Sequence, residues 1–473
     1  MKRRKFLINS LLGAAGLNWV SCKSPKSESD HFNGEEISSN APEYKSGNLS
    51  QGKSILDANE KIILASIGAG GWGTNLALEV GNLKANAEFK YICDVDDTRG
   101  GRAISELGKI QGYEPERVRD MRHVFDDKDV DAVIVATPTH WHTLAALWAM
   151  QAGKDVYLEK CITHNVSEGQ KLAEAAMKYN RILQCGLQNR NASYNWQAAE
   201  YIKSGKLGKI INVSVTGFLL GPVALNEKQE QAPPDFIDWD MWLGPAPKVP
   251  YSISRNKSWH YYWDHSVGMC MEDAIHQFDL MRFVLGNPGL PRSVCSSGGR
   301  YSNQDQREIP DVLNVIYDFE DFTINFQAGE FCQYLIKTAP EIRYSDQFPD
   351  WTTNSTKIII QGTEAMMILG RMGGGWQIFG NDGEKIDQLA GRFPLQDNLL
   401  NYLSCIRSRD VPNANIVQGH LSSTMLHYAN MSFRLGNRQL KIDQESEFIK
   451  DNPEANELAK GYYREGFELP EIT

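Results

Sequence analysis

The chain has 473 residues, of which 23% are charged and 41% hydrophobic, and its formal net charge is −10. This composition is typical of a soluble globular protein, and the length is sufficient for two domains. An acidic chain without a basic stripe cannot neutralise many phosphates, which argues against binding to nucleic acid or to an anionic membrane surface.

The N-terminal segment MKRRKFLINSLLGAAGLNWVSCK is typical of an export signal, with a basic start and an apolar stretch over residues 6–20. Arg3 and Arg4, followed by Phe6, resemble a twin-arginine signal, which exports folded proteins. Cys22 resembles the acceptor cysteine of a bacterial lipoprotein. We therefore expect an export signal over residues 1–22 and a polar tether over residues 23–60, the alternative being a short buried helix. The expected location is the periplasm or the outer membrane, with a lipid on Cys22 as the only membrane contact.

The seven cysteines after Cys22 are widely spaced and odd in number, and none forms a CxxC pair. They indicate neither a disulfide framework nor a metal site, which fits a protein that folds in a reducing compartment before export.

From Lys61 onward, short apolar runs alternate with amphipathic helical patterns. The runs cover residues 62–67, 89–93, 132–136 and 156–158, and helices are expected after Gly73, Thr98 and Thr143. The alternation predicts right-handed βαβ units and a parallel sheet covered by helices, within a dinucleotide-binding domain over residues 61–185.

A glycine-rich turn closes the first predicted strand and opens the first helix. It consists of Gly68, Gly70, Gly71, Trp72 and Gly73, and Asp94 ends the second strand 21 residues after Gly73. Such glycines permit a tight turn and let the backbone approach a pyrophosphate, while the carboxylate accepts hydrogen bonds from the adenosine ribose. The pattern predicts NAD as the cofactor. Arg99 and Arg102 keep NADP as an alternative, and a glycine turn that binds nothing is the remaining one.

Two further polar stretches follow later strands of the same sheet. ATPTHWH contains Thr137, Pro138, His140 and His142, and YLEKC contains Glu159 and Lys160. Ligands bind at the carboxyl ends of parallel strands, so both stretches belong to the predicted cofactor site. His140 and His142 are expected on a loop without an evident third ligand, so no metal site is predicted.

The order of these motifs resembles the glucose–fructose oxidoreductase and inositol dehydrogenase family (Gfo/Idh/MocA). The segments MEDAIHQFDLMRF and DWDMWLGPAP are similar to its second domain, and HYANMSFRLG resembles its secreted or lipoprotein branch. The resemblance implies an α/β fold, with an N-terminal Rossmann domain followed by an α/β domain that has a large, mostly antiparallel open sheet. Segments such as IINVSVTG and KIIIQG independently favour that sheet. We expect the substrate domain over residues 186–440 and a C-terminal arm over residues 441–473. Family members often form homo-oligomers through the open face of the sheet.

The resemblance also implies the catalytic residues. Lys160 would stabilise the developing alkoxide, and His276 would act as general base. Glu272 and Asp273 precede His276 on the same predicted helix, and which of them orients the imidazole or contacts the sugar is open. The alternatives are a surface Lys160 paired with Glu159 and a His276 buried in a helix.

Other positions follow from the same resemblance. It places His142 near the nicotinamide and Gln188, Asn189 and Arg190 at the border of cofactor and substrate. Cys161 stands where the family usually has proline, and a packing role is expected for its thiol. Trp239, Trp242, Trp259 and Trp263 lie within 25 residues and suit a carbohydrate site or a packed core equally well.

The resulting functional prediction is an NAD(P)-dependent oxidoreductase. It would transfer hydride between a tightly held nicotinamide and a secondary hydroxyl of a small-molecule sugar, glycoside or cyclitol, as part of carbohydrate breakdown. The alternatives are an NAD-dependent, redox-neutral glycosidase and a non-catalytic sugar-binding lipoprotein.

Overall fold

The computed structural model describes residues 60–221, 225 and 230–472. The predicted export signal, Cys22 and the tether up to residue 59 lie outside the described residues. Within the described ranges, none of the helices has both the length and the apolar character needed to cross a bilayer.

The first sheet is parallel and, among the described residues, has the strand order β3-β2-β1-β4-β5-β6. Its strands are β1 (Ile62–Ile67), β2 (Ala87–Cys93), β3 (Glu116–Val118), β4 (Ala132–Val135), β5 (Asp155–Leu158) and β6 (Leu183–Cys185). The helices between them are α1 (Gly71–Asn82), α2 (Gly101–Gln111), α3 (Met121–Asp126), α4 (Thr139–Gln151) and α5 (Val166–Lys178). Every residue of β4 and β5 is buried, as expected for central strands covered by helices on both faces. The prediction of an N-terminal Rossmann domain with a parallel sheet covered by helices is confirmed.

The second sheet has the order β14-β13-β12-β11-β7-β10-β9-β8-β15 in the described part of the chain, and all its pairs are antiparallel except β7 with β10. Its strands are β7 (Ile210–Leu220), β8 (Ser293–Gly299), β9 (Val312–Asp318), β10 (Thr323–Cys332), β11 (Lys357–Gly362), β12 (Ala365–Gly370), β13 (Trp376–Gly380), β14 (Lys385–Leu389) and β15 (Leu440–Lys441). Buried and exposed residues alternate along β9, so one face of the sheet is covered and the other is open. The predicted large, mostly antiparallel sheet is confirmed.

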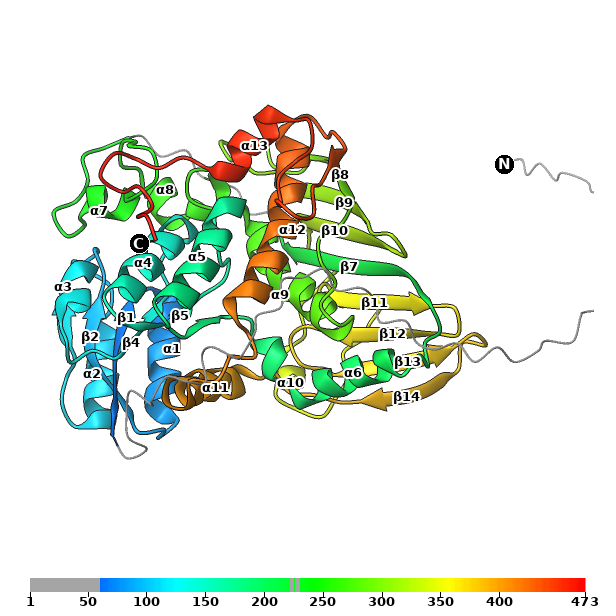
Figure 1. The fold of residues 1–473 in the computed structure, drawn as a ribbon, viewed down its shortest axis with the longest axis horizontal. Helices are drawn as coiled ribbons and strands as arrows, with labels where there is room; N and C mark the ends of the chain where they lie inside the picture. The colour runs from blue at the N-terminus through cyan, green and yellow to red at the C-terminus, as the bar shows by residue number, and fades with distance from the viewer. Residues whose placement is uncertain (1–59, 222–224, 226–229, 473) are drawn as a thin grey trace, which may run out of the picture. The chain divides into compact units, whose positions relative to one another are not determined.

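The remaining helices connect and cover the two sheets. They are η2 (Gln188–Asn191), α6 (Ser193–Lys203), α7 (Trp239–Leu243), α8 (Ile253–Lys257), η3 (Trp259–Tyr261), α9 (Met269–Val284), α10 (Pro340–Arg343), α11 (Leu395–Ser408), α12 (Ile416–Arg434) and α13 (Pro453–Lys460). Figure 1 shows α9 and α12 between the elements of the first sheet and the strands of the second.

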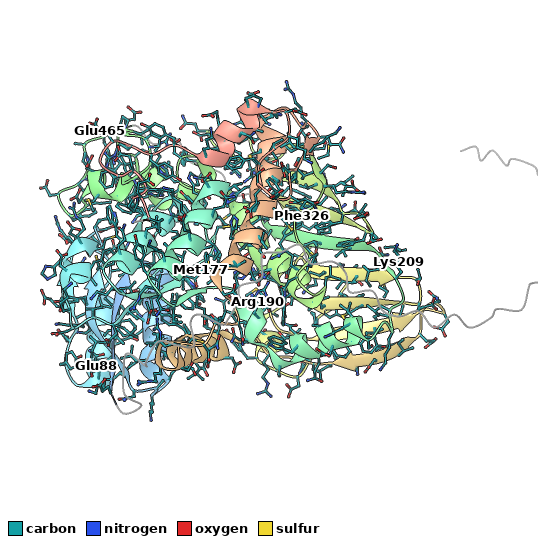
Figure 2. The ribbon with its side chains drawn as sticks, viewed as in Figure 1. Glu88, Met177, Arg190, Lys209, Phe326 and Glu465 are labelled. Atoms are coloured by element: carbon teal, nitrogen blue, oxygen red, sulfur yellow. The ribbon has the colours of Figure 1, made fainter. Side chains whose placement is uncertain are left out.

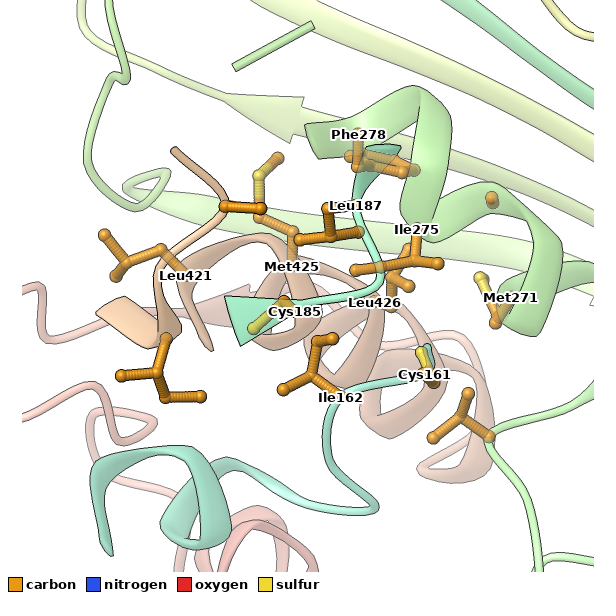
Figure 3. Packing of buried hydrophobic residues seen from close by; sticks show 14 of the residues in the cluster. Cys161, Ile162, Cys185, Leu187, Met271, Ile275, Phe278, Leu421, Met425 and Leu426 are labelled. Carbon is orange, nitrogen blue, oxygen red and sulfur yellow. The ribbon is translucent and has the colours of Figure 1, made fainter. Parts of the chain in front are cut away.

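A shared hydrophobic core joins the two sheets through α9 and α12. Cys161, Ile162, Cys185 and Leu187 come from the first sheet and its loops, and they pack against residues of these two helices (Figure 3). The contributing residues are Met271, Ile275 and Phe278 of α9 and Leu421, Met425 and Leu426 of α12. Because this core is continuous, the segment that carries Lys160 is held rigidly against the helix that carries Glu272.

One predicted boundary is wrong. The sequence pattern places the third helix after Thr143, but α4 begins at Thr139, directly after Pro138 in extended backbone conformation. His140 and His142 therefore lie in the first turn of a helix rather than on a loop. Nearly all residues of this helix are buried, so its sequence has little amphipathic period and could not reveal where the helix starts.

Candidate active site

A cavity of about 430 Å³ lies at the carboxyl ends of β1, β2, β4 and β5. The predicted residues that line it are Gly68, Gly70, Gly71, Trp72, Gly73, Asp94, Thr137, Pro138, Glu159, Lys160, Glu272 and Asp273. Six predicted site residues do not line it, namely His140, His142, Gln188, Asn189, Arg190 and His276. The structure therefore brings the glycine turn, Lys160 and the start of α9 into one cavity.

The glycine turn leaves the N-terminal end of α1 open. Gly68 has φ +88°, and a Cβ there would lie 2.7 Å from the carbonyl carbon of Ala136. A Cβ on Gly73 would lie 2.0 Å from the carbonyl oxygen of Gly68, so this position also excludes a side chain. By contrast, a Cβ on Gly71 would meet nothing within 4 Å, and no side chain of the described residues caps α1. The N–H groups at this helix end suit the pyrophosphate of a dinucleotide.

Asp94 is positioned by the turn that it faces. Its Oδ2 accepts a hydrogen bond from the N–H of Ala69 (2.8 Å), and its Oδ1 accepts one from the N–H of Asp96 (2.9 Å). Burial raises the pKa of Asp94, and these two hydrogen bonds and Arg99 oppose the rise. Each carboxylate oxygen keeps a lone pair for a ribose hydroxyl, which fits NAD. Arg99 also lines the cavity, so NADP remains an alternative.

Lys160 is one of the cations that line the cavity, together with Arg99 and Arg119. Its Nζ lies 3.6 Å from Oε2 of Glu272, and a quarter of its side chain is exposed. Burial alone would lower the pKa of Lys160, but Glu272, Glu159 and Asp273 raise it above its ordinary value. The ammonium is therefore charged near neutral pH and can stabilise an alkoxide.

Glu272 is the carboxylate that contacts Lys160. Its Oε1 accepts hydrogen bonds from the hydroxyls of Thr139 (2.6 Å) and Ser266 (2.9 Å). Burial would raise the pKa of Glu272, but Lys160, His260 and these hydroxyls lower it, so the group is ionised. This geometry couples Thr139, at the start of α4, to Glu272 at the start of α9.

Asp273 points toward a different pair of cations. Its Oδ1 accepts hydrogen bonds from Lys337 (2.7 Å) and Arg371, and its Oδ2 has no hydrogen-bond partner among the described residues. Burial would raise the pKa of Asp273, but Arg371 and Lys337 hold it well below its ordinary value. A carboxylate with one free oxygen at a cavity wall can accept a hydrogen bond from a sugar hydroxyl.

His276 lies one helical turn after Glu272 and is 7% exposed. Its Nδ1 is buried and has no hydrogen-bond partner in the described part of the chain. Burial lowers the pKa of His276, as do the charges of Arg371, Lys160 and Lys337, while Asp273 opposes them. The charge of Lys160 thus affects the imidazole, and His276 is not among the residues that line the cavity. Asp279, three residues after His276 on the same helix, is bound by Arg190, whose Nε lies 2.9 Å from both carboxylate oxygens.

His142 and Gln188 lie next to the cavity residues rather than among them. The ring nitrogens of His142 lie 2.5 Å from the carbonyl oxygen of Cys161 and 2.8 Å from that of Thr137. His142 therefore holds the loop before α4 against the Lys160 segment. Gln188 is buried, with its Nε2 3.4 Å from the hydroxyl of Tyr157 on β5.

Cys161 is a packing residue, and Arg190 forms an ion pair with Asp279. Cys161 is fully buried, and burial raises the pKa of its thiol well above the ordinary value. Figure 2 shows Arg190 between the two sheets, where its ion pair with Asp279 joins η2 to α9. Neither side chain is among those that line the cavity.

The predicted tryptophan cluster divides between two cavities. Trp242 and Trp259 line the cavity that contains Lys160, and Trp239 stacks on Trp242 with centroids 4.5 Å apart. Trp263 lines a second cavity of about 400 Å³, where the guanidinium of Arg434 lies 5.0 Å from the centre of its ring.

Several cavity residues were missed by sequence reasoning, among them Asp96, Arg119, Asn256 and His260. His260, in the run SWHYYW, lines the cavity next to Trp259, and its charge interacts with those of Glu272 and Lys160. The aromatic run was the available signal, but only the fold shows that η3 turns this histidine toward Lys160. In the described ranges, no group of three or more His, Cys, Asp or Glu side chains is arranged to hold a metal ion.

Two family models match the chain. A model described as "Oxidoreductase family, NAD-binding Rossmann fold" matches residues 63–187, and one described as "Oxidoreductase family, C-terminal alpha/beta domain" matches residues 197–330. These ranges contain the first sheet and the helix that carries Glu272.

Several curated proteins are similar over part of the chain. The 2,7-anhydro-N-acetylneuraminate hydratase of Mediterraneibacter gnavus is 26% identical over 260 residues, which cover 54% of this chain and 58% of the relative. The scyllo-inositol 2-dehydrogenase (NAD(+)) of Bacillus subtilis is 27% identical over 224 residues (47% and 54%). The levoglucosan dehydrogenase of Pseudarthrobacter phenanthrenivorans is 29% identical over 193 residues (41% and 42%). The matched regions thus span about half the length of these relatives.

Solved structures share the fold over most of the chain. The WlbA dehydrogenase of Chromobacterium violaceum, in complex with NADH and UDP-GlcNAcA, has a TM-score of 0.59 at 18% identity and covers 83% of this chain and 98% of its own. A levoglucosan dehydrogenase in complex with NADH and levoglucosan has a TM-score of 0.59 at 16% identity (81% and 100%). At these identities the likeness supports the fold.

Proposed function

The chain belongs to the Gfo/Idh/MocA family of oxidoreductases, and we propose that it transfers hydride between NAD and a secondary hydroxyl of a sugar, glycoside or cyclitol. The observation that carries this proposal is the position of the Lys160–Glu272 pair in the same cavity as the open end of α1. Relatives named for dehydrogenation of scyllo-inositol and levoglucosan support the substrate class.

The residues of the cavity would have separate roles in such a reaction. The N–H groups at the start of α1 would hold the pyrophosphate of NAD, and Asp94 would hold its ribose. NAD supplies the hydride acceptor when it is bound. The Lys160 ammonium stabilises the negative charge that develops on the reacting oxygen, and Glu272 keeps that ammonium in place. An imidazole beside Lys160 takes the hydroxyl proton; the family resemblance points to His276 for this role.

We also propose that the enzyme acts outside the cytoplasm, in the periplasm or as an outer-membrane lipoprotein. The support is the sequence pattern of residues 1–22. Because free NAD is scarce there, the cofactor would travel tightly bound within the folded protein and be regenerated in place. A homo-oligomer formed through the open face of the second sheet, and a role in carbohydrate breakdown, belong to the same proposal.

A second candidate function is a redox-neutral glycosidase that oxidises the sugar, eliminates the aglycone and reduces the sugar again. It is favoured by one relative whose name, hydratase, denotes addition of water without net oxidation. Such a cycle would also regenerate a cofactor that stays bound to the enzyme.

The test begins with the full-length protein purified gently from the exported fraction. We expect mass spectrometry to find retained NAD(H), and we expect levoglucosan, scyllo-inositol or a methyl glucoside to change the absorbance of the nicotinamide. A protein that neither retains nor binds NAD(H) would contradict the proposal. Release of reducing sugar without net NADH would instead identify the glycosidase. A Lys160→Ala variant whose cofactor spectrum is the same as that of the unaltered protein would identify a sugar-binding protein.

A further inference from the structure

The second cavity, of about 400 Å³, shares no lining residue with the cavity that contains Lys160. It is bounded by α12, the first turn of α5, the segment before α9 and the C-terminal segment around α13. Figure 1 shows α5, α12 and α13 beside one another at this place. Cavities of this volume hold small organic molecules in many proteins. The proposed function gives this one no role, because cofactor and reacting hydroxyl would both occupy the first cavity.

Three polar residues of the segment HYANMSFRLG line the second cavity from α12. His427, Asn430 and Arg434 are spaced by three and four residues, which places them on one face of the helix. Nε2 of His427 lies 2.9 Å from the hydroxyl of Thr163, and Nδ2 of Asn430 donates a hydrogen bond to the carbonyl oxygen of Val267 (2.8 Å). The other ring nitrogen of the histidine and the amide oxygen of the asparagine have no partner among the described residues, so both are available to a ligand.

Arg434 is the only lysine or arginine among the described residues that line this cavity. Its guanidinium lies over the ring of Trp263, 5.0 Å from the ring centre, and it forms no ion pair with a described carboxylate. The charges of Asp264 and Glu308 reach it from a greater distance, and both of these carboxylates contact Arg255 instead. A guanidinium held over an aromatic ring keeps its N–H edge free for two parallel hydrogen bonds to a carboxylate.

The other two carboxylates of the cavity wall also have partners within the protein. Glu168 accepts a hydrogen bond from the hydroxyl of Tyr463 (3.0 Å), and Glu457 lies 2.9 Å from Nζ of Lys460. Neither of them therefore pairs with Arg434, whose charge is left for a ligand.

We propose that the second cavity binds a small sugar that carries a carboxylate, a uronic acid being the simplest example. Arg434 binds the carboxylate, and the free atoms of His427 and Asn430 hydrogen-bond the ring hydroxyls. Tyr462, which lines the cavity and is 66% exposed, offers its ring to the apolar face of the sugar. This inference does not depend on the proposed function.

The test measures the binding of glucuronate to the full-length protein by isothermal titration calorimetry, with glucose and acetate as companion probes. We expect glucuronate to bind about 10–100-fold more tightly than glucose, because hydrogen bonds to a charged partner are lost without the carboxylate. It should also bind more tightly than acetate, which lacks the sugar ring.

Four variants locate the bound sugar. In Arg434→Met, which keeps the apolar stem, the preference for glucuronate over glucose should disappear. Arg438→Met is the matched control, since Arg438 is exposed, follows α12 and lines neither cavity. Tyr462→Ala should weaken glucuronate binding a few-fold and leave acetate binding unchanged. Lys160→Met should bind glucuronate as the unaltered protein does, because Lys160 belongs to the first cavity.

An Arg434→Met protein that binds glucuronate at the unaltered affinity contradicts the inference. So does a loss of binding in Lys160→Met alone, which would place the sugar in the first cavity. Equal affinities for glucuronate and glucose contradict the role of the carboxylate, and equal affinities for glucuronate and acetate contradict the role of the ring. If circular dichroism shows that Arg434→Met is unfolded, Arg434→Lys replaces it. That variant keeps the charge without the planar fork and should weaken glucuronate binding severalfold, and unaltered binding would contradict the inference. None of these measurements requires turnover, so the proposed function and this inference can fail separately.

Discussion

At the scale of single residues, the charges of the cavity are set by partners on distant segments. Lys160 follows β5, Glu272 begins α9, and each holds the other in its charged form. Thr139 and Ser266 fix the carboxylate from two further segments. An ammonium held in this way needs little reorganisation when negative charge develops on a nearby oxygen.

Replacing Lys160 with methionine keeps the length of the side chain and removes its charge. We expect kcat to fall by about 10²–10³-fold, because an electrostatic contact to the reacting oxygen is lost. NADH affinity should stay within a few-fold, because the pyrophosphate and ribose positions are untouched. Rapid-mixing absorbance of the nicotinamide measures the first quantity, and fluorescence titration measures the second.

Lys128→Met is the control, since Lys128 is an exposed lysine away from the cavity. Equal rates for Lys160→Met and Lys128→Met would show that the Lys160 charge takes no part in the reaction.

We expect Asp94 to determine the preference for NADH over NADPH. In Asp94→Ala we expect the Kd for NADH to rise about 10–100-fold, because the ribose acceptor is lost together with two hydrogen bonds that shape the turn. The ratio of NADPH to NADH affinity should rise as well, because Arg99 then faces a 2′-phosphate without the opposing carboxylate. Asp129→Ala, at an exposed position, should leave both constants unchanged. An Asp94→Ala protein with unchanged NADH affinity would place the ribose elsewhere.

At the scale of elements, two glycines at the start of α1 have different roles. Gly73 has no room for a Cβ, whereas Gly71 has open space around it. The first is required by packing within the turn, and the second leaves the helix end accessible.

Gly73→Ala and Gly71→Ala therefore form a matched pair. Gly73→Ala should lower the free energy of unfolding by roughly 1–3 kcal/mol, because the new methyl group collides with the carbonyl oxygen of Gly68. Gly71→Ala should leave the free energy of unfolding nearly unchanged. Urea unfolding of both variants, followed by circular dichroism, measures the difference, and equal midpoints would contradict the close approach of Gly73 to Gly68.

Much at this scale was predictable from the sequence. The order of strands and helices around Gly68–Gly73, the large second sheet and the helix over residues 269–284 all follow from periodicity and from the family resemblance. The start of α4 did not, since its almost entirely buried sequence lacks an amphipathic period. The choice of Glu272 over Asp273 as the partner of Lys160 also needed coordinates, because adjacent carboxylates on a helix point in different directions. His260 was missed because the aromatic run around it suited a packed core as well as a binding site, and only the fold shows that it lines the cavity.

At the scale of the molecule, the first sheet is completed by residues from far along the chain. Leu399, Tyr402 and Ile406 of α11 pack with Leu64 and Ile134 of the first sheet in one buried cluster. Arg409, just after α11, pairs with Asp155 at the start of β5, and both side chains are buried. A helix from within residues 186–440 therefore belongs, by its packing, to the nucleotide-binding half.

Arg409→Ala tests how much the buried ion pair between Arg409 and Asp155 contributes to the free energy of unfolding. Removing the guanidinium leaves the Asp155 carboxylate buried without its cation, so we expect a loss of roughly 3–5 kcal/mol in the free energy of unfolding. Arg392→Ala breaks an exposed ion pair with Asp346 and should have no measurable effect. Thermal and urea unfolding compare the two, and similar midpoints would show that the buried pair contributes no more than the exposed one.

The place of α11 also fixes an order of events during synthesis. The ribosome releases β1, the glycine turn and Lys160 early, yet part of the hydrophobic layer on one face of their sheet arrives only with residues 395–406. We therefore expect the packing around the nucleotide pocket to be completed only after residues 395–406 have been synthesised. On this expectation, cofactor binding would be a late step in the making of this protein.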